Sequence, residues 1–303
     1  MACNSMVFGA GDWFWKIMNY SQLLKKIEQY KNKYNIKVIG KTLLGRKIFA
    51  VEKLLSEQFF TAIFIASVHA RENITTDLLC RFLDEGLFDD IKNFNLSFIL
   101  MSNPDGVELS SGGIFSVSDD LLRQNLLNMN LNNQDFSLWK ANARGVDVNN
   151  NFDANFGQNV TNKSPASQGF CGECCESENE TIALVKYTKS KKAFLSISYH
   201  SKGEEIYYNF FQKKKNLERD KLIAERFAKS TGYSIRNVEN LSSGGYKDWC
   251  VQKLKIPSLT IEVGSDDLCH PITIENLDEI FEKHKKVAFD VEFAYNVYNR
   301  YCR

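Results

Sequence analysis

Residues that bind metals or carry protons stand where two apolar segments of this sequence end. His69 and Glu72 follow the apolar run 60–66 in the stretch SVHAREN, and His200 ends the run FLSISYH. Two imidazoles and one carboxylate are the three protein ligands of an open, catalytic zinc site, in which water takes the fourth position. The HxxE pair alone is a weak signal, because such four-residue matches arise by chance. The second histidine at the end of a strand strengthens it.

A further carboxylate, Glu262, lies inside the otherwise apolar segment SLTIEV at 258–263. A lone buried charge is costly unless it is paired or used. Beside a metal-bound water, a glutamate can take the water's proton and pass it to a leaving amine. The alternative, an outward-facing residue on a half-exposed strand, stays open at this stage.

The pattern of apolar residues predicts the elements that must position these side chains. Strands are expected at 36–39, 47–53, 60–67, 96–102, 194–200, 205–209 and 258–263. Helices are expected at 20–34, 73–86, 178–191, 216–231, 244–249 and 273–299, with a turn at 103–106 and a loop or loose helix at 124–134. Strands that alternate with helices indicate an α/β protein with a largely parallel or mixed sheet. Functional groups of such sheets gather where strands end.

Composition narrows the class of protein. Among 303 residues, 38 Lys+Arg against 37 Asp+Glu give a net charge of +1, so no basic excess favours nucleic acid as a partner. No apolar run approaches the roughly 18 residues that span a membrane. The first residues lack the basic start and apolar core of a secretory signal. We therefore expect a cytoplasmic protein whose eight cysteines are free thiols.

Several motifs, in the same order, resemble those of the zinc carboxypeptidase family, the carboxypeptidase A-like metallopeptidases. They are HARE at 69–72, NPDG at 103–106, GVDVN at 145–149, YHS at 199–201, GGYKDW at 244–249 and TIEVG at 260–264. The resemblance implies an N-terminal extension, 1–19, and one catalytic domain, 20–303. It also implies a mixed, about eight-stranded central sheet with helices on both faces.

The resemblance further implies one Zn²⁺ per chain, bound by His69, Glu72 and His200. Glu262 would then act first as a general base and then as a general acid. Arg71 would lie beside the metal and polarise the scissile carbonyl or hold a substrate carbonyl; its alternative is an ordinary surface arginine.

Asp147 would, by the same resemblance, accept a hydrogen bond from the ring of His69. Its alternative is an aspartate in a turn, which Gly145 makes plausible.

Within the family, the segments 139–149, 199–208 and 244–249 look most like the bacterial γ-D-glutamyl-diamino acid endopeptidases. The resemblance places Tyr246 and Lys247 among the substrate-binding residues. Lys247 would attract the distal carboxylate of diaminopimelate. A solvated helix residue is the alternative for Lys247.

The sequence departs from the family at Asn150, where exopeptidases carry the arginine that grips the substrate's terminal carboxylate. Asparagine cannot make that charged bidentate bond. Asn149 remains as a weaker anchor, and Lys140 or Arg144 could supply positive charge from the same loop. Otherwise the enzyme does not require a free C-terminus beside the cut bond, which suits an endopeptidase.

Asn240, the cysteines at 171–175 and two further histidines carry expectations of their own. Asn240 falls where digestive carboxypeptidases carry a mobile tyrosine. The CxxCC cluster at 171–175 is expected to hold reduced thiols rather than a second metal. His270 is expected at the edge of the cleft, and His284 on a solvated helix face.

The expected function is a zinc-dependent peptidase that hydrolyses the γ-D-glutamyl-diaminopimelate bond of murein-derived peptides. One alternative is a carboxypeptidase that removes acidic C-terminal residues, and the other is a catalytically silent peptide-binding protein on the same fold. The expected partner is a peptide, with no nucleic acid and no membrane. The sequence does not predict the oligomeric state.

Overall fold

The computed structural model describes residues 17–158, 160–236 and 244–302, so Asn240 and residues 1–16 of the expected extension lie outside the described residues. The strands are β1 Asn35–Lys41, β2 Lys47–Lys53, β3 Thr61–Ile65, β4 Asn95–Ile99, β5 Ala193–His200, β6 Glu205–Tyr207, β7 Ser234–Arg236 and β8 Ser258–Glu262. The helices are α1 Tyr20–Tyr30, α2 Ile74–Asp84, α3 Pro104–Gly112, α4 Asp120–Met129, α5 Asn179–Lys189, α6 Lys214–Thr231, α7 Tyr246–Trp249, α8 Leu277–His284 and α9 Val287–Cys302.

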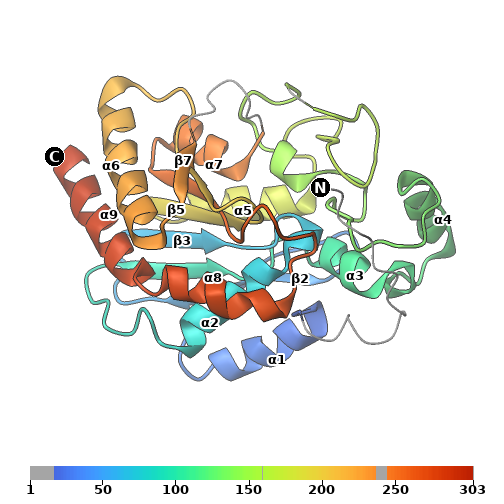
Figure 1. Cartoon of the computed structure of the whole chain (residues 1–303), viewed down its shortest axis with the longest axis horizontal. Coiled ribbons are helices and arrows are strands. Elements are labelled where there is room, and N and C mark those ends of the chain that lie inside the picture. The colour runs from blue at the N-terminus through green and yellow to red at the C-terminus, as the bar shows by residue number, and fades with distance from the viewer. Residues whose placement is uncertain (1–16, 159, 237–243, 303) are drawn as a thin grey trace.

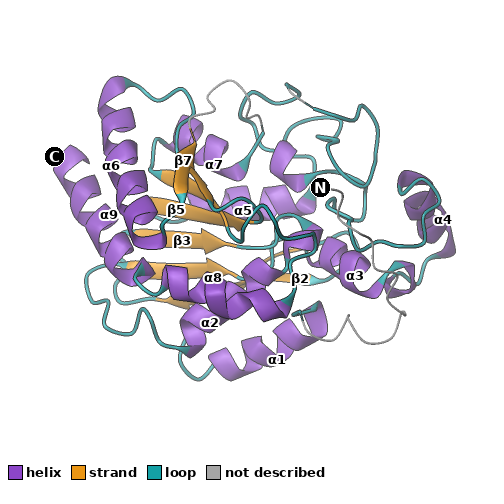
Figure 2. Cartoon of the chain, viewed as in Figure 1, coloured by secondary structure: helices purple, strands orange, loops and turns teal. Residues whose placement is uncertain are grey.

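The strands form one eight-stranded mixed sheet in the order β1-β2-β4-β3-β5-β8-β6-β7, between layers of helices (Figures 1 and 2). The central strands β4, β3, β5 and β8 are parallel, whereas β1, β2 and β6 run antiparallel to the neighbours that link them to this centre. This architecture confirms the predicted fold class. Because β3, β5 and β8 point the same way, their carboxyl ends meet at one edge of the sheet.

The two faces of the sheet bury different clusters of side chains. One cluster joins Phe64, Tyr199 and Ile261 to apolar residues of α1, α2, α6, α8 and α9. The other joins Ile63 and Trp249 to residues of α5 and α7. Side chains alternate between faces along a strand. The residues that follow Tyr199 and Ile261 in the chain therefore point toward the α5 and α7 side.

A glycine pair joins α7 to the loop that follows residue 148. Gly244 has φ +71, and a Cβ there would stand 2.3 Å from the carbonyl oxygen of Asn150. The Gly244 carbonyl accepts a bond from the Phe152 N–H at 2.9 Å, and the Tyr246 N–H donates to Asn149 Oδ1 at 3.1 Å. Only glycine permits this backbone approach.

Three expected elements differ in type or number in the structure, and several others differ in their bounds. The expected turn at 103–106 opens α3, because the Asn103 side chain accepts from the Gly106 N–H and Pro104 occupies the first turn. The expected helix 273–299 is two helices, with α8 packed on α2 and α9 on α6. The segment 124–134 is helical only to Met129. No helix in the described ranges is long and apolar enough to cross a bilayer.

Met18, which the sequence analysis placed in the extension, belongs to the packed domain. Its side chain is buried in the larger cluster, and its N–H donates to Asp77 Oδ2 at 3.1 Å. The packed domain therefore begins before α1.

His284 is buried rather than solvated, so that expectation was wrong. Its side chain is 1% exposed and packs against the rings of Phe82, Tyr199 and Tyr233. The ring's Nδ1 lies 2.7 Å from the Ile280 carbonyl, to which it can donate. Burial among aromatic rings lowers the pKa of His284 to about 4.

Replacing His284 by asparagine should reduce the amount by which the free energy of unfolding falls as the pH is lowered. The folded-state pKa of about 4 lies below the ordinary 6.5, so the stability carried by the neutral ring is complete above pH 6.5 and is lost as the pH falls toward 4. That gap corresponds to about 3 kcal/mol. Urea unfolding between pH 4 and 7 should show that much less pH dependence in the variant. A difference between the two proteins that does not change with pH would contradict the prediction.

Candidate functional site

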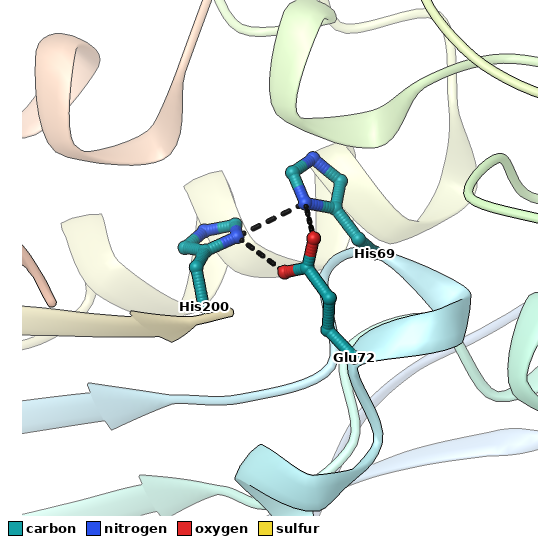
Figure 3. A group of neighbouring side chains, drawn as sticks. All are labelled: His69, Glu72 and His200. Carbon is teal, nitrogen blue, oxygen red and sulfur yellow. Dashed lines mark hydrogen bonds and ion pairs between the residues drawn. The ribbon is translucent and has the colours of Figure 1, made fainter. Parts of the chain in front are cut away.

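His69, Glu72 and His200 converge in a buried cluster (Figure 3). Glu72 Oε1 lies 2.9 Å from His69 Nδ1, and Glu72 Oε2 lies 2.9 Å from His200 Nδ1. The two Nδ1 atoms are 3.0 Å apart. The sequence placed these residues 131 positions apart at most, and the structure brings them within contact of one another.

Two neighbouring strands position the cluster. His69 follows β3 and begins the 3₁₀ turn Ala70–Glu72, which brings Glu72 back beside it. His200 is the last residue of β5, which pairs with β3 in parallel. A strand end therefore supplies one ligand candidate, and a tight turn at the end of its neighbour supplies the other two.

The far side of each imidazole ring faces a polar partner. His69 Nε2 lies 3.2 Å from Asp147 Oδ1, and the Gly169 N–H donates to Asp147 Oδ2 at 3.2 Å. His200 Nε2 lies 2.9 Å from the Ser198 hydroxyl. A carboxylate beside Nε2 favours the proton on that atom, which leaves the lone pair of His69 Nδ1 directed at the cluster.

The negative charge of Glu72 makes this cluster suitable for binding a cation. Burial alone would raise the pKa of Glu72, but the two imidazoles outweigh it and hold the pKa well below 4.5. Burial alone would also raise the pKa of Asp147, but Lys140 and His69 outweigh burial and lower this pKa below its ordinary value. Two ring nitrogens and a carboxylate, with ligand atoms within 4.8 Å of one another, match the nitrogen and oxygen ligands that zinc accepts. The donor set fits this metal.

Glu262 ends β8 directly beside His200. The two residues are register partners in the parallel pair β5–β8, so their side chains share one face of the sheet. Burial raises the pKa of the half-buried Glu262 to about 8; the His200 charge opposes this shift and the Glu72 charge adds to it. A carboxyl group that titrates near neutrality can both accept and return a proton.

Arg71 lies in the turn between His69 and Glu72, and its side chain reaches a separate loop. Its NH1 group donates to the Leu138 carbonyl and to Gln168 Oε1, each at 3.2 Å. Hydrogen bonds to two neutral groups thus fix the guanidinium beside the cluster, and its positive charge is not neutralised by them.

Two of the cationic side chains expected to bind substrate, Lys140 and Arg144, lie beside carboxylates of the protein. Lys140 Nζ lies 3.4 Å from Asp147 Oδ2, where it supports the carboxylate behind His69. Arg144 is half exposed, and its Nε lies 3.8 Å from Glu178 Oε2. Each of the two side chains therefore faces a carboxylate of the protein itself.

The α7 residues expected to contact substrate are buried. Tyr246 is fully buried in the smaller core cluster, and its hydroxyl lies 2.9 Å from that of Thr188. Lys247 is buried too, donates to the Asn209 carbonyl at 2.8 Å and forms an ion pair with Asp248. Since Asp248 neutralises Lys247, a substrate carboxylate would have to compete with it. The alternative of a solvated Lys247 is wrong.

The cysteine cluster is not part of the candidate metal group among the described residues. Cys171, Cys174 and Cys175 are free thiols, and the Asn151 side-chain amide donates to the carbonyls of Cys171 and Cys174. Cys269 is disulfide-bonded, so the expectation of free thiols is wrong at that position.

Two residues that contact the cluster or its partners, Ser198 and Gly169, were not predicted from the sequence. Ser198 could have been found, because strand alternation places it on the same face as His200. Gly169 carries no local signal, since its backbone N–H reaches Asp147 only through the fold of a loop.

The fold and the cluster together give an α/β protein with a candidate metal site and a neighbouring carboxyl group of raised pKa at the carboxyl edge of a mixed sheet, an arrangement typical of metal-dependent hydrolases. The family model for zinc carboxypeptidases (Peptidase_M14) matches residues 20–281, and the chain belongs to this zinc peptidase family.

The chain is 30% identical over 296 residues to gamma-D-glutamyl-L-diamino acid endopeptidase 1 of Lysinibacillus sphaericus, covering 89% of this chain and 72% of that protein. Two solved structures share its fold. Thrombin activatable fibrinolysis inhibitor (TAFI) matches with a TM-score of 0.73 and 18% identity, over 96% of this chain and 76% of that one. Murein-tripeptide amidase MpaA from Escherichia coli O157 matches with a TM-score of 0.56 and 21% identity, over 85% and 91%.

Replacing His200 by alanine should remove most zinc binding, because it leaves only two of the three candidate ligands. We expect wild type to bind one zinc per chain and the variant to bind at least about 100-fold more weakly. Competition with a chelator, followed by metal analysis, measures the difference. His284→Asn is a matched control, as a buried histidine outside the cluster. Equal zinc affinity in His200→Ala and wild type would place the metal elsewhere.

Proposed function

We propose that the protein is a zinc-dependent peptidase that hydrolyses the γ-D-glutamyl-diaminopimelate bond of murein-derived peptides. The observation that carries the peptidase chemistry is the register pairing of Glu262 with His200, which sets a proton carrier beside the His69–Glu72–His200 cluster. Support for the particular bond comes from the similarity to gamma-D-glutamyl-L-diamino acid endopeptidase 1 and from the asparagine at position 150.

His69, Glu72 and His200 would hold the metal. Bound zinc supplies a Lewis acid that polarises the scissile carbonyl and lowers the pKa of water. Asp147 and Ser198 keep the two imidazole rings oriented, and Lys140 keeps Asp147 ionised.

Glu262 carries the proton in both halves of the reaction. As a carboxylate it accepts a proton from the attacking water, and as a carboxylic acid it returns that proton to the leaving amine. The Glu72 charge contributes to the raised pKa of Glu262. Any cation held by Glu72 offsets this charge and favours the ionised form that a base requires.

Arg71 and Asn149 would contact the substrate beside the cut bond. Arg71 keeps N–H donors beyond those on Leu138 and Gln168, and these suit acceptor oxygens on the acyl side. The Asn149 oxygen is committed to the Tyr246 N–H, which leaves its amide N–H₂ group for the substrate.

Position 150 favours cleavage that does not depend on a terminal carboxylate. Asparagine there is neutral, while Arg144 lies beside Glu178 and Lys140 beside Asp147. Both cations of the loop thus already face carboxylates of the protein, which disfavours their use for a C-terminal carboxylate at the cut bond. Lys247 is not assigned to the distal carboxylate of diaminopimelate, since Asp248 already neutralises it.

Replacing Glu262 by glutamine should lower kcat by about 10²–10⁴-fold while zinc content stays unchanged, because the amide cannot carry the proton. The matched control is Glu205→Gln. Glu205 is the register partner of Glu262 on β6, and its carboxylate contacts Arg236 and Tyr207. Wild type that contains zinc yet cleaves no peptide, with Glu262→Gln behaving like it, would favour a silent binding protein. Equal, measurable activity in both proteins would contradict the role proposed for Glu262.

Incubation with L-Ala-γ-D-Glu-diaminopimelate should release L-Ala-D-Glu and diaminopimelate, which mass spectrometry identifies. The α-linked isomer and peptides ending in free or amidated acidic residues test the alternatives. Cleavage of only the free-acid peptides, with none of the γ-linked bond, would establish a carboxypeptidase instead.

A further inference from the structure

A cavity adjoins the candidate metal site on the side of Arg71. It has a volume of about 300 Å³ and is lined by Arg71, Asn130, Leu131, Asn133, Asp135, Leu138, Ser167 and Gln168. Most of these residues come from the asparagine-rich segment after α4, which the proposed chemistry does not use. The volume is at the small end of ligand pockets, the size of a short peptide fragment.

Backbone hydrogen bonds connect the walls of this cavity to the cluster. The Ala70 N–H, next to His69, donates to the Lys140 carbonyl at 3.1 Å. The N–H groups of Lys140 and Ala141 donate in turn to the Ser167 carbonyl at 2.9 and 3.0 Å. The cavity is thus held against the turn that carries Glu72, and a substrate at the cluster can extend into it.

The amide oxygens of the lining are already used within the protein. Gln168 Oε1 accepts from Arg71, and Asn133 Oδ1 accepts from the Asp135 N–H at 3.0 Å. The amide N–H₂ groups of both side chains have no acceptor within the described part of the chain and remain available as donors. Together with Arg71 they favour a ligand that carries carbonyl or carboxylate oxygens.

Asp135 adds the opposite charge to the same cavity. Its Oδ1 accepts from the Ser137 N–H at 2.8 Å, and among the described residues neither Asp135 nor Arg71 forms an ion pair. One cation and one anion with neutral amides between them complement a group that carries both a carboxylate and an ammonium. An acyl-side dipeptide with a free N-terminus has these groups.

We propose that this cavity binds the acyl-side dipeptide of the substrate and that Asp135 recognises its free N-terminal ammonium. The inference rests on the proposed peptidase function and narrows it to peptides whose N-terminus is unblocked. Arg71 and the amides of Asn133 and Gln168 take the oxygens of the dipeptide. The exposed leucines 131 and 138 flank its side chains.

The test compares L-Ala-γ-D-Glu-diaminopimelate with its N-acetyl form, which lacks the charge. Wild type should cleave the free-amine peptide about fivefold more efficiently, through KM, since an exposed charge pair contributes about that factor. Asp135→Asn should lose this preference while the kcat/KM for the acetylated peptide stays constant. Asp90→Asn, an exposed aspartate between α2 and β4, should keep it.

Equal cleavage of both peptides by wild type, or a preference that persists in Asp135→Asn, would overturn the inference and leave the proposed function standing. If neither peptide is cleaved, the proposed function fails, and calorimetry with L-Ala-γ-D-Glu and its N-acetyl form decides on the cavity. Tighter binding of the free-amine dipeptide that Asp135→Asn abolishes supports the inference. Equal binding overturns it.

Discussion

Glu72 holds its carboxylate between two imidazole rings in a buried site, and the surrounding structure is organised around keeping that charge there. A buried carboxylate is tolerated only when positive charge or hydrogen-bond donors compensate it. His69 and His200 provide this compensation at 2.9 Å each, and they hold the pKa of Glu72 low. Their ability to do so depends on Asp147 and Ser198 behind the rings, and therefore on the loop that carries Asp147 as well as on β5.

The sequence predicted the cluster because each member stands at a strand end or one turn beyond it. Parallel strands bring such ends together, so His69, His200 and Glu262 converge once β3, β5 and β8 are neighbours. The mixed sheet and its flanking helices were predictable for the same reason, from apolar runs and ordered motifs. Helix boundaries were less so: a motif read as a turn, Asn103 to Gly106, starts α3 because the asparagine caps it.

The partners of charged side chains could not be predicted from the sequence. Lys140, Arg144 and Lys247 all looked available to a substrate, yet each lies beside a carboxylate, and the partner of Arg144, Glu178, is distant in the chain. Tyr246 looked like a binding residue but fills the core. His284 sits in a charged stretch and is nevertheless buried by rings from α2, β5 and the segment before β7. Pairing and burial of this kind arise from tertiary contacts that local pattern does not encode.

The contact between Gly244 and the backbone of Asn150 has a consequence for how specificity can change in this fold. Asn149 and Tyr246, 97 positions apart, are joined by a hydrogen bond, and no side chain fits between the two segments at the glycine. The loop around Asn150 and the start of α7 therefore behave as one exchangeable unit. A chimera that transplants either segment from a relative must carry the other with it to keep the same backbone spacing.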